Sequence, residues 1–216
     1  MHALVEAADV PGPYVLVGHS LGGIFVRQYA GAYPDEVAGL VLVDPSHEDQ
    51  EVVLEELVGP ELWAQYERTE AGFVDVEGLD VDATFDETRH ACAAAPLPEV
   101  PLVVLTHGVP LDASQLPTGW PIQADERQWR ELHADLAGLV PGGHQIIAER
   151  SGHYIQIDQP ELVVAAIREV GAEMSEAGKA ESPPVGGNGG STEIERSAGT
   201  EATASGAIQP EKADRC

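Results

Sequence analysis

The sequence predicts an α/β fold in which a mostly parallel β-sheet is flanked by helices. Three short, continuously apolar segments, 14–17, 40–43 and 102–105, are typical of parallel strands that are covered on both faces. Between the first two segments, apolar residues recur at helical spacing until Tyr33 and Pro34 end the pattern. This alternation of strand, helix and strand indicates βαβ units.

Local patterns predict the elements around these strands. The amphipathic residues 2–9 predict a first helix, which the segment Pro11-Gly12-Pro13 ends. Beyond the third strand, the sequence predicts a helix over about 124–139, a short strand over 144–148 and a last helix over about 160–173.

The length of 216 residues allows one domain with a tail left over. Past Glu176 the sequence consists mainly of Gly, Ser, Thr, Glu, Ala and Pro, so residues 176–216 are expected to be disordered. The two cysteines, Cys92 and Cys216, do not imply a disulfide framework, which favours a reducing compartment.

The charge balance restricts the partners. The chain carries 37 acidic and 11 basic residues and a formal net charge of −26, which repels phosphate backbones and anionic membrane surfaces. Nucleic acids and membranes are therefore not expected as partners. The expected partner is a small-molecule substrate. The sequence has no signal-peptide pattern and no membrane-spanning run, so a cytoplasmic location is expected. The oligomeric state stays open.

A tight turn between strand and helix is predicted at Gly18-His19-Ser20-Leu21-Gly22. Serine at such a corner is the nucleophile of a "nucleophile elbow", in which the hydroxyl is held clear of the backbone and faces a histidine. Gly18 and Gly22 are expected to stand where a Cβ would clash. The motif therefore makes Ser20 the candidate nucleophile.

With this elbow, the chain resembles the α/β-hydrolase superfamily from about His2 to about Gly171. The resemblance implies a serine hydrolase in which Ser20 attacks a carbonyl carbon, a histidine takes its proton and a carboxylate orients that histidine. It is carried by five segments in the expected order, PYVLVGHSLGG at 13–23, YPDEV at 33–37, GLVLVD at 39–44, PLVVLTHG at 101–108 and SGHY at 151–154.

The resemblance also implies the domain organisation. Residues 1–45 and 99–175 would form the α/β-hydrolase core, and the acidic, helix-compatible segment 46–98 would form a helical cap over the pocket. The apolar residues of this segment either line the roof of the pocket or only pack the cap onto the body. These are Leu54, Leu57, Leu62, Trp63, Tyr66 and Phe73.

His153 is the candidate general base. It follows the nucleophile and lies between the last strand and the last helix, as the serine, acid, histidine order of this fold demands. His19 is expected to point away from the serine hydroxyl, and His107 and His47 could line the pocket. The other histidines are expected at the surface or in packing, namely His2, His90, His133 and His144.

Two aspartates compete for the role of the acid. Asp44 ends the strand at 40–43, so its side chain would emerge at the carboxyl edge of the sheet. Asp112 follows the next strand, which is the more usual location in the family, but its loop is longer and richer in proline than expected. The sequence favours Asp44, with Asp112 as the alternative and Asp49 as a distant third.

The oxyanion that forms on attack needs two preorganised donors. The backbone N–H of Leu21 would supply one, and in the family the other comes from a loop after an early strand, often marked by His-Gly. The dipeptide His107-Gly108 stands on a later strand and is expected to be a turn. The chain is therefore expected to lack the first strands of the family's sheet. It is either a fragment or mis-started product of a longer enzyme, or a truly short protein, and we favour the first explanation. In either case the elbow strand would have an open edge.

These features predict a serine hydrolase that cleaves an ester or related acyl bond of a small, largely apolar molecule. Ser20 argues against the relatives that use an aspartate nucleophile, and no cofactor is expected because P-loop, dinucleotide and metal motifs are absent from the sequence. A non-catalytic binding protein, or an inactive fragment without the second oxyanion donor, is the alternative. A transferase or lyase on the same scaffold also stays open.

Overall fold

The centre of the protein is a parallel four-stranded sheet. The structure is a computed structural model that describes residues 1–70, 80–94 and 96–180. The sheet has the order β1-β2-β3-β4, and each strand is parallel to its neighbour. The predicted parallel sheet flanked by helices is thus confirmed. The strands are β1 (Tyr14–His19), β2 (Val37–Val43), β3 (Leu102–His107) and β4 (His144–Ala148).

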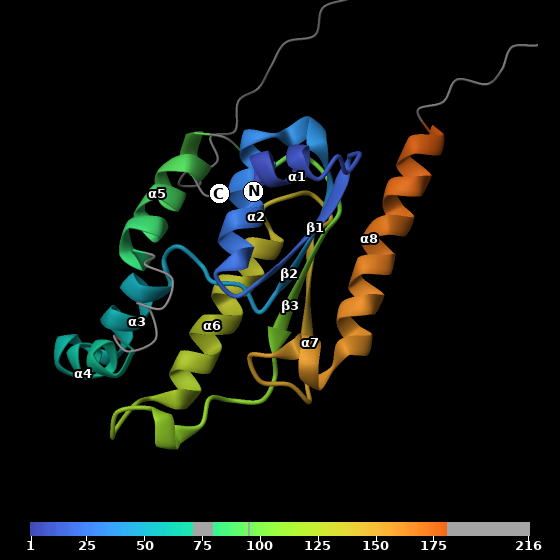
Figure 1. Ribbon diagram of the computed structural model, residues 1–216. Helices are drawn as coiled ribbons and strands as arrows, with labels where there is room; N and C mark the ends of the chain where they lie inside the picture. The colour runs from blue at the N-terminus through green and yellow to red at the C-terminus, as the bar shows by residue number, and fades with distance from the viewer. Residues whose placement is uncertain (71–79, 95, 181–216) are drawn as a thin grey trace, which may run out of the picture.

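Helices cover both faces of the sheet. In Figure 1, α2 and α6 lie on one side of the strands and α8 lies on the other. The segment after β2 forms three helices, of which α3 contacts α4 and α6 while α5 contacts α2. The helices are α1 (His2–Ala7), α2 (Gly22–Ala32), α3 (Gln50–Val58), α4 (Pro60–Glu70), α5 (Val81–Ala94), α6 (Ile122–Ala137), α7 (Ile155–Asp158) and α8 (Pro160–Ala180), with 3₁₀ turns η1 (Pro34–Glu36) and η3 (Ala113–Gln115).

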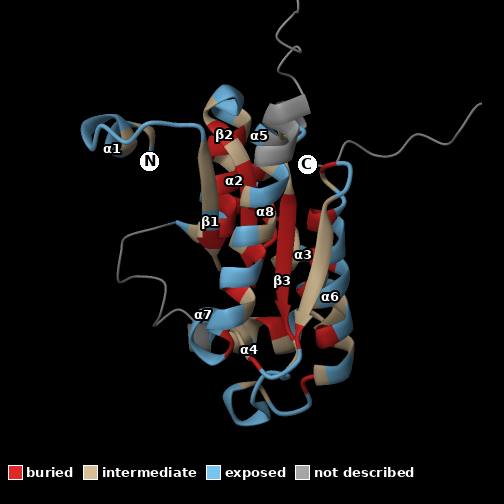
Figure 2. Cartoon of the chain, turned by 90° about the vertical axis from the view of Figure 1, so that its right-hand side faces the viewer, coloured by how far each residue is buried: buried red, intermediate tan, exposed pale blue. Residues whose placement is uncertain are grey.

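The core is divided by the sheet into two apolar clusters. Successive side chains of a strand point to opposite faces, so Leu40 and Leu42 of β2 pack with α2 and α6, whereas Val41 and Val43 pack with α8. Every residue of β3 is buried, as Figure 2 shows by the red colour along this strand. The continuous apolar runs in the sequence reflect this coverage of both faces.

β1 forms one edge of the sheet. It pairs with β2 along its length, and no other strand within the described ranges pairs with it. Val17 in this strand is 44% exposed, whereas the residues of β2 are buried except for Ala38. The open edge expected for the elbow strand is therefore observed.

The last helix is longer than predicted. α8 continues to Ala180, so the expectation that disorder begins at residue 176 is wrong for 176–180. Ala, Glu and Lys are good helix formers, and extending an existing helix needs no new nucleation step. Residues 181–216, the rest of the predicted tail, lie outside the described residues. Over the part of the chain that the structure describes, none of the helices is long and apolar enough to cross a membrane.

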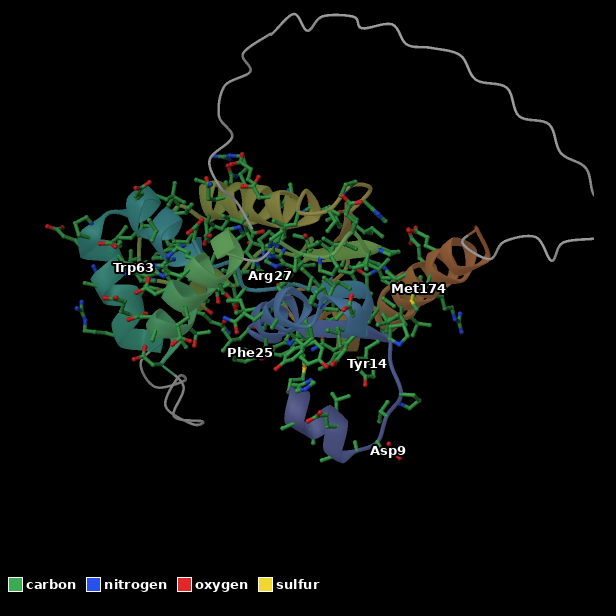
Figure 3. The ribbon with its side chains drawn as sticks, turned by 90° about the horizontal axis from the view of Figure 1, so that it is seen from above. Asp9, Tyr14, Phe25, Arg27, Trp63 and Met174 are labelled. Atoms are coloured by element: carbon green, nitrogen blue, oxygen red, sulfur yellow. The ribbon has the colours of Figure 1, made fainter. Side chains whose placement is uncertain are left out.

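A buried ion pair ties α2 to the segment that follows β2. Arg27 of α2 donates to Glu48 at 2.6 Å, and the two side chains are only 0% and 6% exposed. Figure 3 shows Arg27 in the interior of the molecule, between the helices. Burial by itself would raise the pKa of Glu48, but the guanidinium of Arg27 outweighs it and lowers this pKa. The pair thus holds Glu48, four residues after Asp44, against the body of the protein.

Breaking this pair is expected to destabilise the fold strongly. Glu48→Gln leaves the cation of Arg27 buried without its anion, which costs about 3–5 kcal/mol in the free energy of unfolding. Urea denaturation measures the loss. The matched control is Glu161→Gln, because Glu161 pairs with Arg150 at the surface, where the side chains are 64% and 73% exposed, and its loss is expected to leave the urea midpoint almost unchanged. Equal midpoints for Glu48→Gln and wild type would contradict this role of the pair.

Candidate active site

Ser20 occupies the sharp turn between β1 and α2. Its backbone φ is 55°, a left-handed conformation that a non-glycine residue rarely adopts. The turn is held by hydrogen bonds from Ser20 N to Val43 O at 3.1 Å and from Ser46 N to Ser20 O at 2.9 Å. These bonds join the turn after β1 to the last residue of β2 and to the loop that follows it. The expected elbow geometry is therefore present.

The glycines around Ser20 differ in importance. A Cβ on Gly18 would lie 2.5 Å from the carbonyl oxygen of Gly22, which confirms the steric need for glycine at that position. A Cβ on Gly22 would meet nothing within 4 Å, so the prediction for Gly22 is wrong. The second close approach is at Gly23 instead, where a Cβ would lie 2.5 Å from Pro45 Cβ. Gly23 thus lets α2 pack against the loop that carries Asp44.

Asp44 lies at the centre of a buried hydrogen-bond network. It follows β2 directly, has a φ of 42° and is completely buried. Its Oδ1 accepts from His107 N at 3.0 Å and from Trp129 Nε1 at 3.2 Å, and its Oδ2 lies 2.7 Å from His153 Nδ1. Burial alone would raise the pKa of Asp44, but the hydrogen bonds from His107 and His153 outweigh it and hold the pKa well below its usual range. Asp44 is therefore ionised at neutral pH.

His153 is oriented from two sides. Its Nδ1 contacts Asp44, and its backbone carbonyl accepts a hydrogen bond from His19 Nε2 at 3.0 Å. The His19 and His153 rings also lie 4.6 Å apart, centre to centre. With Nδ1 on the carboxylate, Nε2 of His153 is the nitrogen available for proton transfer. In the described chain Ser20 Oγ makes no hydrogen bond, but Ser20 and His153 line the same pocket. Catalytic hydrogen bonds are often long before substrate binds.

The two other aspartates lie elsewhere. Asp112 is exposed and caps the 3₁₀ turn η3 by accepting from Ser114 N at 2.9 Å. Asp49 precedes α3 and lies 3.5 Å from Arg89. Of the three candidate acids, Asp44 is the one that contacts His153.

The remaining histidines separate into pocket and packing residues. His107 lines the pocket, as expected, whereas His47 is buried outside it and its Nδ1 accepts from Asp49 N at 3.0 Å. His133 is fully buried between Thr106 Oγ1 and the carbonyl of Pro45, each at 2.8 Å. Burial lowers the pKa of His133 to about 4, so its ring is neutral.

A pocket of about 610 Å³ opens beside Ser20 and His153. Of the proposed roof residues, Leu54 and Tyr66 line it, whereas Leu57, Leu62 and Trp63 pack in the apolar cluster behind it. Phe73 lies outside the described residues. The pocket is lined by Ser20, Asp44, Ser46, Gln50, Leu54, Tyr66, His107, Leu111, Gln115, Leu116, Trp120, Asp125, Glu126, Trp129, His153 and Tyr154.

Helix α6 contributes site residues that the sequence reasoning missed. Glu126, Trp129 and His133 lie at spacings of three and four, on one face of this helix, and all three interact with groups at the carboxyl ends of the strands. This spacing of polar and aromatic residues was a detectable signal in the sequence. It marks the α6 face that packs against Asp44 and His107.

Comparisons with known proteins agree with this architecture. A model of the alpha/beta hydrolase family matches residues 2–166. YqjL of Bacillus subtilis, an uncharacterized protein, is 26% identical over 170 residues, which cover 79% of this chain and 61% of YqjL. Lipase LipV of Mycobacterium tuberculosis is 39% identical over 85 residues, which cover 35% of this chain and 33% of LipV. The chain thus spans less than two thirds of either relative.

A solved structure shows the same fold. Mouse alpha/beta hydrolase domain-containing protein 10 matches with a TM-score of 0.50 and 20% sequence identity, over 80% of this chain and 68% of the mouse chain. At this identity the match bears on the fold alone. The family model, by contrast, covers well over half of the sequence, and we conclude that the chain belongs to the alpha/beta hydrolase family.

Proposed function

We propose that the protein is a serine hydrolase that cleaves carboxylic esters of small, largely apolar molecules. The observation that carries the proposal is the 2.7 Å contact between Asp44 Oδ2 and His153 Nδ1 at the edge of a pocket that Ser20 also lines. A buried carboxylate on Nδ1 holds the imidazole in the tautomer whose Nε2 can accept a proton. The relationship to a protein named as a lipase favours ester substrates.

The proposed reaction has two stages. Ser20 Oγ attacks the ester carbonyl carbon while His153 Nε2 takes the hydroxyl proton, and the proton then passes to the departing alcohol to leave an acyl-serine. Water attacks the acyl-serine with the same histidine as base, which releases the carboxylic acid and restores Ser20. Throughout, Asp44 stays ionised and stabilises the imidazolium of His153.

One oxyanion donor is proposed at the start of α2. Leu21 caps this helix, and its backbone N–H makes no hydrogen bond within the described chain. The first N–H groups of a helix have no partner inside the helix and lie at the positive end of its dipole, where they stabilise negative charge. Leu21 N–H would therefore stabilise the oxyanion formed on attack by Ser20.

A series of p-nitrophenyl esters with increasing acyl length tests this function. We expect turnover, with a kcat/KM that rises by at most about fourfold per added methylene until the pocket is filled. The limit follows because burying one CH₂ contributes about 0.8 kcal/mol of binding free energy. Beyond that length kcat/KM is expected to fall. The readout is p-nitrophenolate release by the purified 216-residue chain, corrected for the uncatalysed rate. Release that does not exceed this background for any ester would contradict the proposal.

A further inference from the structure

His107 bridges two carboxylates beside the proposed catalytic residues. It ends β3 and is only 4% exposed. Its Nδ1 lies 2.9 Å from Asp44 Oδ2, and its Nε2 lies 3.2 Å from Glu126 Oε2. An ionised carboxylate can only accept hydrogen bonds, so both ring nitrogens need a proton to satisfy these contacts. This geometry requires the imidazolium form of His107.

The groups that face His107 support the same charge state. Asp44 contacts it from the end of β2 and Glu126 from α6, and His153, from the loop after β4, contacts the same Oδ2 of Asp44. Burial alone would lower the pKa of His107, but the hydrogen bonds to Asp44 and Glu126 outweigh it and raise this pKa to about 9. Three further residues of α6 lie in this region. The carboxylate of Asp125 accepts a hydrogen bond from Trp120 Nε1, and His133 is neutral. The ring of Trp129 lies 6.0 Å from that of His107, centre to centre.

We propose that His107 is a positioning residue of this catalytic site, a buried cation that clamps Asp44 toward His153 and offsets part of its negative charge. This inference rests on the proposed function. The clamp has two parts, because both the backbone N and the side-chain Nδ1 of His107 donate to Asp44. Glu126 in turn fixes the far side of the ring and accepts from Leu111 N at 3.0 Å.

The charge balance of the cluster suits a base that becomes cationic during the reaction. At rest, Asp44, Glu126 and the His107 cation sum to −1, and the sum becomes zero when His153 takes the proton of Ser20.

Imidazole NMR tests the charge state without any assay of activity. In the wild-type protein at pH 7.5, the ring nitrogens of His107 are expected to have the shifts of an imidazolium, with assignment by loss of the signals in His107→Asn. Glu126→Gln removes one of the two carboxylates and is expected to lower the titration midpoint of His107 by about one pH unit or more. Glu131→Gln, at an exposed position of the same helix, is the matched control and should leave it unchanged. A neutral His107 ring at pH 7.5 would overturn the proposal.

The pH profile of kcat/KM separates positioning from a merely structural role. His107→Asn keeps a hydrogen-bond donor but removes the charge, so the acidic limb of the profile is expected to move up by about one pH unit. His144→Asn, at a half-buried histidine that pairs with Glu169 away from the pocket, is the control. A lower plateau with an unmoved limb would contradict the proposal. If wild type hydrolyses no ester, the proposed function fails, and the NMR result still decides whether the cationic bridge exists.

Discussion

The Ser20→Ala variant is expected to lose ester hydrolysis almost completely, with kcat reduced by a factor on the order of 10⁴ or more. In the proposed mechanism this variant removes the atom that forms the acyl intermediate, and neither His153 nor Asp44 replaces it. Ser20 is also held at a φ of 55°, so the chain maintains a strained backbone at this position. The measurement is p-nitrophenolate release under saturating substrate.

The control for this variant is Ser114→Ala. Ser114 is an exposed serine in the 3₁₀ turn η3, and it does not line the pocket. Its replacement is expected to leave kcat unchanged, which shows that the loss in Ser20→Ala is specific to its position. Wild-type turnover by Ser20→Ala would exclude the acyl-serine mechanism.

The second large effect is expected for Asp44→Asn, with kcat reduced by about 10³–10⁴. Asparagine has nearly the same shape, but its neutral amide neither stabilises the His153 imidazolium nor enforces the required tautomer. Asp112→Asn is the matched control, because Asp112 is exposed and contacts Ser114 instead of His153. We expect no change in kcat for this control.

The pair of variants decides between the two acids that the sequence left open. Because Asp44 is buried among four donor groups of His107, Trp129 and His153, the urea midpoint of Asp44→Asn is measured alongside its kcat to show that the variant is folded. A larger loss in Asp112→Asn than in folded Asp44→Asn would assign the acid to Asp112 and contradict the proposed role of Asp44.

Most of the fold could be predicted because its central strands, β2 and β3, are buried on both faces. Such strands read as unbroken apolar runs, and the helices between them keep a helical apolar spacing. The ends of the elements were less predictable: β2 begins at Val37, three residues before the apolar run at 40–43, and α8 continues to Ala180. Helix and strand ends depend on tertiary contacts as well as on local sequence.

The sequence could also place Ser20, Asp44 and His153 at the carboxyl edge of the sheet, because chain order and strand ends determine that edge. It could not show which side chains meet across the edge. The approach of Gly23 to Pro45, and the contact of His107 with Glu126, depend on how α2 and α6 pack on the strands. Only the spacing of Glu126, Trp129 and His133 on α6 was available as a signal.

The most direct test of the proposed hydrolase mechanism is to locate the nucleophile chemically. The full 216-residue chain is treated with a fluorophosphonate, digested and analysed by mass spectrometry, with and without an excess of a p-nitrophenyl ester. We expect one phosphonyl adduct on Ser20, slowed by the ester and absent from Ser20→Ala. A chain that takes up no phosphonate, or that takes it up at another serine of the pocket such as Ser46, would contradict the assignment of Ser20 as the nucleophile.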